Sequence, residues 1–479
     1  MNCMLSMTIR SLLLVLLLSS TALSQKEALY KSIHKRDAAS WRVAMEIWEL
    51  AEPGYQETRS AALLSGMLEE AGFEIQKPVA QIPTAFTATA GSGKPVIGIL
   101  GEYDALPGLA QQATPQRDPR PGNGYGHGCG HHLFGVASAS AAIAIAEQIR
   151  EGQITGTVRF YGCPAEEGGS AKVFMVQAGL FEDCDVVLHW HPGSTNSAGD
   201  RSTLARIAVK FRFHGTSAHA AGAPEQGRSA LDAIALTNHA AELLREHTPD
   251  KTRIHHVITY GGDAPNVVPN FAEVYYYIRH PSSDVVGELY PRLERCAQGA
   301  ALATETRLEI HHQGGIKEIL PNNVLSQVSL ANLKQLNDLE YSRADIRFAT
   351  RLGESLPRPQ PLDSIKQVLS FSGGTGMGST DVGDVSWVVP TAGFSTACWV
   401  PGTPGHSWQA VACGAQPIAR KGMNLAARVI AANAWDLYTQ PERVAAAREE
   451  LQQKLTGRAY QSLMLPGQEP PLDYRDAPR

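Results

Sequence analysis

The sequence predicts an α/β protein whose catalytic part is a largely parallel sheet flanked by helices. Three short apolar runs, at residues 96–100, 157–161 and 186–188, have the length and composition of buried strands. Two helical stretches, residues 133–150 and 170–179, separate them. The alternation of strand and helix is typical of a parallel sheet covered by helices. Ligands bind at the carboxyl ends of the strands in such sheets, so the residues that follow each apolar run are the first candidates for a site.

A glycine-spaced loop at residues 126–132 is the most informative motif, with the order Gly-His-Gly-Cys-Gly-His-His. Glycine permits positive φ and close backbone approach, and imidazole and thiolate are the donors that zinc prefers. The loop alone is equally compatible with a structural zinc site or a redox site.

Three further clusters favour catalysis. Glu166 and Glu167 follow the second apolar run, His189 and His191 follow the third, and His406 lies in a late Pro/Gly segment. Together with the glycine-spaced loop they supply more donors than one tetrahedral zinc needs, which favours a site for two metal ions with activated water. Such a site also needs a carboxylate that moves the proton, and two adjacent glutamates, which point different ways in an extended segment, can divide these roles. Their spacing does not fix which glutamate is the ligand and which the base.

The motifs resemble those of the aminoacylase and carboxypeptidase family of dinuclear metallo-amidohydrolases. The resemblance rests on segments that occur in one order along most of the chain: residues 101–109, the glycine-spaced loop, 161–170, 190–192, 217–221, 227–233, 265–268, 278–279 and 405–407. It implies a zinc-exopeptidase-like catalytic domain with an inserted smaller α+β lid or dimerisation domain. The implied boundaries are residues 25–203 and 314–450 for the catalytic domain, 204–313 for the lid and 451–479 for a helix end and tail.

The resemblance also implies roles for individual residues. It makes Glu166 the general base and acid, and it assigns the two divalent metal ions, zinc or manganese, to Cys129, His131, Glu167, His191 and His406. In the lid it implies that His219, Asn266 and Arg279 contact the substrate. A guanidinium binds a carboxylate through two parallel hydrogen bonds, so Arg279 is the expected clamp for a terminal carboxylate. His219 is expected to polarise the scissile carbonyl or to hold the oxyanion.

One residue departs from the pattern of this family. His132 stands where Asn or Asp usually follows the ligating histidine. An imidazole at this position either orients a ligand with a different reach or itself joins the metal ligands.

The amino terminus predicts export. Residues 1–24 contain Arg10, an apolar run at residues 12–18, and small residues at Ala22 and Ser24, which together are typical of a signal peptide. The run is too short to span a bilayer, and no cysteine follows it to accept a lipid. We therefore expect a periplasmic or secreted protein without a membrane anchor.

Composition sets looser bounds. The 479 residues suit two domains, and 42 basic against 47 acidic residues, with no basic patch, argue against nucleic acid as a partner. Six cysteines remain after the predicted signal peptide, and the sequence leaves open whether they form disulfides. A homodimer, or pairing with a homologous subunit, is expected from the resemblance.

The expected reaction is hydrolysis of the amide bond of an N-acyl amino acid or a dipeptide, with p-aminobenzoyl-glutamate as the nearest specific substrate. Two alternatives stay open at this point. One is a hydrolase with Cys129 as nucleophile beside a histidine, which would leave the glutamate pair without a role. The other is a non-catalytic protein that binds metal or amino-acid conjugates, which would have no use for a proton shuttle.

Overall fold

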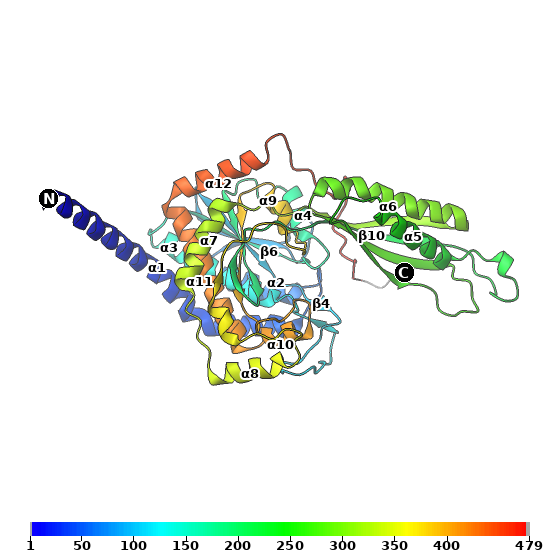
Figure 1. Ribbon diagram of the computed structural model, residues 1–479, viewed down its shortest axis with the longest axis horizontal. Helices are drawn as coiled ribbons and strands as arrows, with labels where there is room; N and C mark the ends of the chain where they lie inside the picture. Colours follow the sequence, from blue (N-terminus) through cyan, green and yellow to red (C-terminus); the bar gives the residue numbers. More distant parts are fainter. Residues whose placement is uncertain (1, 476–479) are drawn as a thin grey trace.

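The computed structural model describes the backbone of residues 2–475 and the side chains of residues 26–475. The predicted signal peptide, residues 1–24, therefore lies outside the part whose side chains are described. The backbone of this segment belongs to helix α1 (Asn2–Leu50), and its first half extends away from the body of the molecule (Figure 1).

The catalytic domain is built on a six-stranded sheet in the order β1-β2-β6-β3-β7-β15. The three predicted strands are confirmed as the centre of this sheet, where β3 runs parallel to both β6 and β7. β15 is parallel to β7, whereas β2 and β1 form an antiparallel edge. The strands are β1 (Glu74–Gln76), β2 (Phe86–Ser92), β3 (Val96–Glu102), β6 (Gly156–Cys163), β7 (Val186–Leu188) and β15 (Thr391–Ala392).

Helices cover this sheet. The predicted alanine-rich helix is α3 (His131–Arg150), which packs on β3 and β6 and is in turn covered by α1 and α11 (Pro417–Thr439). It is the one helix of the described residues long and apolar enough to cross a membrane, but 89% of that window is buried, so its apolarity is explained by its place in the core. The other helices are α2 (Thr58–Glu70), α4 (Ala171–Gln177), α7 (Asn323–Leu336), α8 (Arg343–Gly353), α9 (Val382–Ser386), α10 (Trp408–Gly414), α12 (Pro441–Lys454) and the 3-10 turn η2 (Leu362–Lys366).

Two small sheets complete this domain. One has the order β14-β9-β16-β8. Its strand β8 starts at His191, shortly after the third predicted strand, and the pairing of β8 with β16 holds His191 in place. Its strands are β8 (His191–Gly193), β9 (Asn196–Ala198), β14 (Val368–Leu369) and β16 (Phe394–Ala397), and the second sheet pairs β4 (Leu106–Pro107) with β5 (Tyr125–Gly126).

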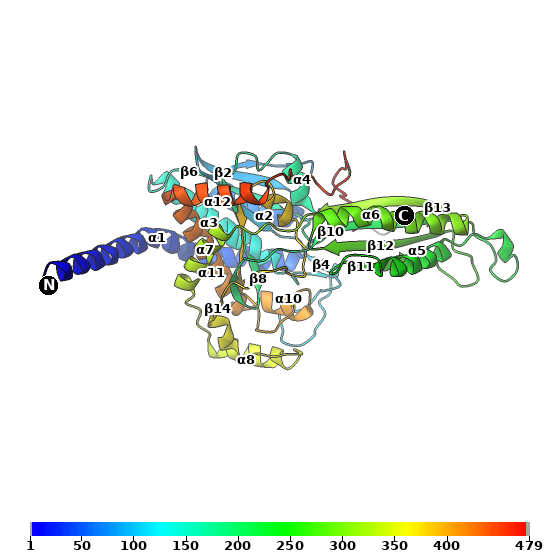
Figure 2. The same ribbon diagram turned by 45° about the horizontal axis from the view of Figure 1, so that its top comes forward.

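The lid is a separate four-stranded antiparallel sheet with two helices on one face (Figure 2). Alternate residues of its strands, such as Ile207 and Tyr276, form a second apolar core under the helices. The opposite face of the sheet carries Arg206, near the start of β10, and Tyr277, near the end of β12. Both residues line the cavity next to the catalytic domain. The elements are β10 (Ala205–His214), η1 (Pro224–Gln226), α5 (Ala230–Arg245), β11 (Arg253–Tyr260), β12 (Phe271–His280), α6 (Ser283–Thr304) and β13 (Arg307–Ile316).

The carboxyl-terminal tail runs back over both domains after α12. Leu463 packs against the lid core, and the side chain of Met464 is buried in the core of the catalytic domain. Farther along, Tyr474 stacks edge-on against Tyr55 of the catalytic domain, with 5.7 Å between ring centroids. The tail therefore connects the lid to the catalytic domain a second time.

Candidate active site

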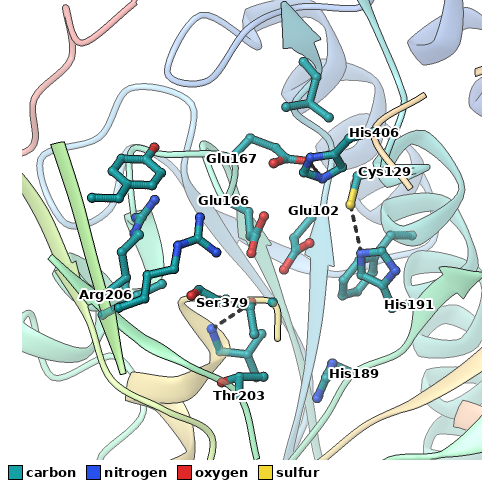
Figure 3. A pocket seen from close by; sticks show the side chains of 18 of the residues that line it. Glu102, Cys129, Glu166, Glu167, His189, His191, Thr203, Arg206, Ser379 and His406 are labelled. Carbon is teal, nitrogen blue, oxygen red and sulfur yellow. Dashed lines mark hydrogen bonds and ion pairs between the residues drawn. The ribbon is translucent and has the colours of Figure 1, made fainter. Parts of the chain in front are cut away.

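A cavity of about 720 Å³ lies between the two domains, at the carboxyl ends of β3, β6 and β7. Figure 3 shows Cys129, Glu166, Glu167, His191 and His406 around one space. His131 lies in the same cluster, within ligand-sharing distance of Cys129 and His191. The cavity is thus at the edge of the sheet where the sequence predicts it.

The glycine-spaced loop delivers Cys129 and His131 because glycines permit its path. Gly130 has φ +79°, in the left-handed region that favours glycine, and directly precedes His131, the first residue of α3. A Cβ on Gly128 would come within 2.6 Å of Leu109 and 3.3 Å of the His406 backbone. The amide of His406 donates to the carbonyl of Gly128 at 3.0 Å, so the late loop is fastened to the early one.

Buried carboxylates orient His131. Its Nδ1 lies 2.8 Å from Oδ1 of Asp104, and its Nε2 lies 3.1 Å from Oε2 of Glu102. All three side chains are at most 1% exposed. Although burial raises its pKa, the neighbouring His131 holds the pKa of Asp104 below its usual value, so Asp104 is an ionised acceptor. A carboxylate behind a metal-ligating imidazole fixes its tautomer and orientation.

The expected ligands fall into two groups that share one thiol. Cys129, His131 and His191 form one group, Cys129, Glu167 and His406 form another, and within each group the ligand atoms lie within 4.8 Å of one another. Sγ of Cys129 is 3.3 Å from Nε2 of His191, and Nε2 of His406 is 3.3 Å from Oε1 of Glu167.

Orphaned buried atoms show that this donor set fits metal ions. Nε2 of His131, Oε2 of Glu102 and Oε1 of Glu167 are buried and make no hydrogen bond within the described residues. The first two atoms lie 3.1 Å apart and Oε1 of Glu167 lies 3.3 Å from Nε2 of His406, so these donor atoms face one another without being satisfied. Buried polar atoms are normally paired, so several unpaired donor atoms in one cavity indicate a ligand site. Thiolate, imidazole and carboxylate together are ligands of zinc and related divalent ions.

The two glutamates lie in a tight turn after β6, which corrects the expectation of an extended segment. Ala165 has φ +52°, and its amide donates to the buried carboxylate of Glu57 at 2.8 Å. The amide of Glu167 donates to Oδ2 of Asp104 at 2.9 Å. Because the backbone turns here, Glu167 is placed in a donor group with Cys129 and His406, and Glu166 in a group with Glu102 and His131.

The local charges favour a thiolate at Cys129. Burial raises its pKa, but the positive charge of His191 and then of His131 outweighs this and brings the pKa well below its usual value. The adjacent Cys129 and Glu167 groups in turn raise the pKa of His406 to about 11. The negative charge of Cys129 and the positive charges of the neighbouring histidines therefore stabilise each other.

A buried ion network lies behind the ligands. Nζ of Lys172 is 2.7 Å from Oε1 of Glu102 and 2.7 Å from Oδ1 of Asp381, and these side chains are 0–1% exposed. Charges without water contact are tolerated only when they are paired. Lys172 thus leaves the other oxygen of Glu102 facing His131 and the cavity.

The lid contributes only part of what the resemblance implies. Arg279 lines the cavity, whereas His219 and Asn266 do not; they lie beside each other, where the amide of Ala220 donates to the carbonyl of Asn266. Nδ1 of His219 accepts from the amides of Ala221 and Gly222. Within one chain, these two residues are therefore not brought to Glu166.

The remaining sequence candidates are placed as follows. His132 does not belong to a donor group; its Nε2 lies 3.0 Å from the carbonyl of Gly414, and it is buried beside His127. His189 lines the cavity, and burial lowers its pKa to about 3. The six cysteines of the described residues are all unpaired.

Several residues in or behind the cavity were not found from the sequence. Glu102 lies two residues after the predicted apolar run and ends β3, so its position alone could have marked it. Lys172 and Arg206 are cations within otherwise apolar segments, which only weakly indicates a buried functional role. Arg475 lies in the carboxyl-terminal tail, and no sequence pattern there predicts that it lines the cavity.

The fold and the donor groups define a two-domain protein with candidate metal-ligating side chains between its domains, and the comparisons place it among hydrolases. Residues 203–302 match the peptidase dimerisation domain of the M20 family. The chain is 40% identical to one of the subunits of p-aminobenzoyl-glutamate hydrolase of Escherichia coli, covering 87% of this chain and 93% of that protein. It is 30% identical to Xaa-Arg dipeptidase of Mus musculus, covering 85% and 88% respectively.

Among solved structures, a dinuclear metal-binding M20 peptidase from Bacillus subtilis superposes with a TM-score of 0.55 at 19% identity, over 85% of this chain and 99% of that one. The chain belongs to the M20 peptidase family, the metallo-amidohydrolase family that its motifs resemble. The predicted fold class and the enzymatic interpretation are confirmed.

Proposed function

We propose that the chain cleaves the amide bond of an N-acyl amino acid or a dipeptide, with two divalent metal ions and Glu166 as the proton shuttle. The observation that carries the proposal is the shared cavity: Glu166 faces the same space as two donor groups joined by Cys129. The relatives named above are a hydrolase of an aminobenzoyl amino acid and a dipeptidase, so both substrate classes suit the family.

The ligands in this proposal are Cys129, His131, Glu167, His191 and His406. Zinc or manganese bound there would supply Lewis acidity for the scissile carbonyl and for an attacking water. Thiolate and imidazole favour zinc, whereas the carboxylate also admits manganese.

Glu166 suits a proton carrier because of its surroundings. Burial, and then the negative charges of Glu102 and Glu167, raise its pKa well above the usual value. A carboxyl group of raised pKa can accept a proton and later return it to the leaving amine. Positive charge in the cavity, from Arg206 as well as from bound metals, would counteract part of this rise.

On the substrate side, Arg279 is the proposed clamp for a terminal carboxylate. Its Nε is buried without a partner in the described residues, as expected for a group that faces a ligand. His219 and Asn266 remain proposed contacts that need either another lid position or the lid of a second subunit. The dimerisation domain, and the fact that the E. coli relative is itself one subunit of its enzyme, support a homodimer or a pair with a homologous subunit.

Export remains part of the proposal. Its support is the charged, apolar and small-residue pattern of residues 1–24. Amino-terminal sequencing of the protein from a fractionated cell tests it: a start at Gln25 outside the cytoplasm supports export, and an intact Met1 in the cytoplasm contradicts it.

The reaction is tested with purified protein loaded separately with zinc and manganese. Free amine is measured after incubation with N-acyl amino acids, dipeptides and p-aminobenzoyl-glutamate. Release that a chelator abolishes, and metal restores, supports the proposal. Release that survives complete metal removal would instead favour Cys129 as a nucleophile, and no release with metal bound would contradict amide hydrolysis of these substrates.

A further inference from the structure

Two arginines lie side by side on adjacent strands of the lid sheet, where their like charges repel each other and lower the stability of the fold. Arg206 on β10 and Arg279 on β12 are direct register partners. Their guanidinium carbons lie 4.7 Å and 5.3 Å from the centre of the same ring, that of Tyr277. Like charges directly opposite each other on a sheet are destabilising, and an anion bound between or beside them would offset this repulsion.

No carboxylate of the described residues lies within ion-pair distance of Arg206 or Arg279. Arg206 is 5% exposed. Among the residues that the structure describes, its Nε has no partner and its one side-chain hydrogen bond goes to the hydroxyl of Ser170 at 3.1 Å. Glu166 lies opposite Arg206 across the cavity (Figure 3).

A third guanidinium reaches the cavity from the carboxyl-terminal tail. Nη2 of Arg475 donates to the carbonyl of Glu167 at 2.7 Å, and its Nε is buried without a partner among the described residues. Arg475 lines the same cavity as Arg206, Arg279 and Tyr277. Three cations, two from the lid and one from the tail, thus reach one cavity.

Contacts along its length hold the tail in this position. The side chain of Gln468 donates to the carbonyl of His312 in the lid at 2.9 Å, and Arg458 pairs with Asp284 at 3.1 Å. Tyr474 is 6% exposed and fills the space over Gly54 and Gly168, where an added Cβ would touch it. Because Tyr474 is anchored, the next residue, Arg475, has a defined place in the site.

We propose that Arg475 is a specificity-determining residue that binds a second carboxylate of the substrate, while Arg279 and Arg206 hold the terminal one. The inference rests on the proposed amide hydrolysis and narrows its substrates to N-acyl derivatives of dicarboxylic amino acids. One carboxylate is satisfied by one bidentate guanidinium, so a site with three guanidiniums that form no ion pair with the described residues matches a ligand with more than one negative charge. The tail is then part of the active site.

The test compares two substrates of equal size, p-aminobenzoyl-glutamate and p-aminobenzoyl-glutamine, which differ in the side-chain charge. Wild type should prefer the glutamate compound. Arg475→Gln should lower kcat/KM for it by about tenfold or more, mainly through KM, and change the glutamine compound by less than about twofold. Arg475→Lys, which keeps the charge and a donor for the carbonyl of Glu167, should recover part of the preference.

Arg347→Gln, an exposed arginine on α8, is the matched control and should change neither substrate. Metal content is measured for each variant, because Arg475 contacts the backbone of Glu167. Equal losses on both substrates, or no loss on either, would overturn the role of Arg475. A wild type that cleaves both substrates equally overturns the inference alone, whereas a metal-loaded wild type that cleaves neither contradicts the proposed function itself.

Discussion

Replacing Asp104 by asparagine tests how the metal ligands are held. The carboxylate accepts two hydrogen bonds, from Nδ1 of His131 at 2.8 Å and from the amide of Glu167 at 2.9 Å. Asparagine has the same shape but only one acceptor oxygen, so its NH₂ group must face one of the two donors. A buried donor left unsatisfied costs about 1–3 kcal/mol, and loss of such a supporting contact weakens metal binding by roughly 10–100-fold.

The assay is competition for zinc between the protein and a chromophoric chelator at neutral pH. Asp104→Asn should bind the tighter zinc ion roughly 10–100-fold more weakly than wild type. Asp363→Asn is the control, because that carboxylate is 85% exposed and far less constrained. An Asp104→Asn protein that is folded and binds zinc within about twofold of wild type would refute the reasoning.

Three further outcomes are expected. Lys172→Met leaves Glu102 and Asp381 buried without their cation, so unfolding by urea should show a loss of about 3–5 kcal/mol, against little change for Lys334→Met on the surface of α7; equal midpoints would contradict the buried network. Burial raises the pKa of Asp384 to about 7. Because the folded form then binds its proton more tightly than the unfolded form, this group's contribution to stability should fall as pH rises from about 4 to about 7. The difference between the stability profiles of wild type and Asp384→Asn should change across that window, and parallel profiles would exclude the raised pKa. Removal of metal by a chelator should lower the melting temperature, and zinc should restore it, because metal binds the folded chain; an unchanged melting temperature would argue against a metal held by these ligands.

The sequence predicts that these donor side chains gather at one edge of the sheet, because its signals are local. Each of Cys129, His191 and the glutamate pair stands within a few residues of a buried strand or helix start, and parallel strands bring their carboxyl ends to one edge. The glycines beside Cys129 indicate a tight loop: Gly130 has φ +79°, and a Cβ on Gly128 would come within 2.6 Å of Leu109. The late candidate ligand His406 could be assigned only through the resemblance, since no spacing connects it to the rest.

What the sequence does not predict depends on contacts between distant segments. The pairing of Arg206 with Arg279 follows from the register of β10 and β12, which sequence periodicity does not set. Arg475 reaches the cavity because the tail packs on two domains, and that path has no repeating pattern. The neighbours of His132 in the sequence make it a candidate ligand, but the start of α3 turns its ring toward Gly414.

The division of labour between Glu166 and Glu167 is the most direct test of the account. Glu166→Gln and Glu167→Gln are purified side by side, and metal content and amine release are measured on the same samples. Glu166→Gln should keep its metal and lose about 10²-fold or more in turnover, whereas Glu167→Gln should lose metal. A Glu166→Gln protein with full metal and full activity would contradict the assignment of Glu166 as the proton shuttle.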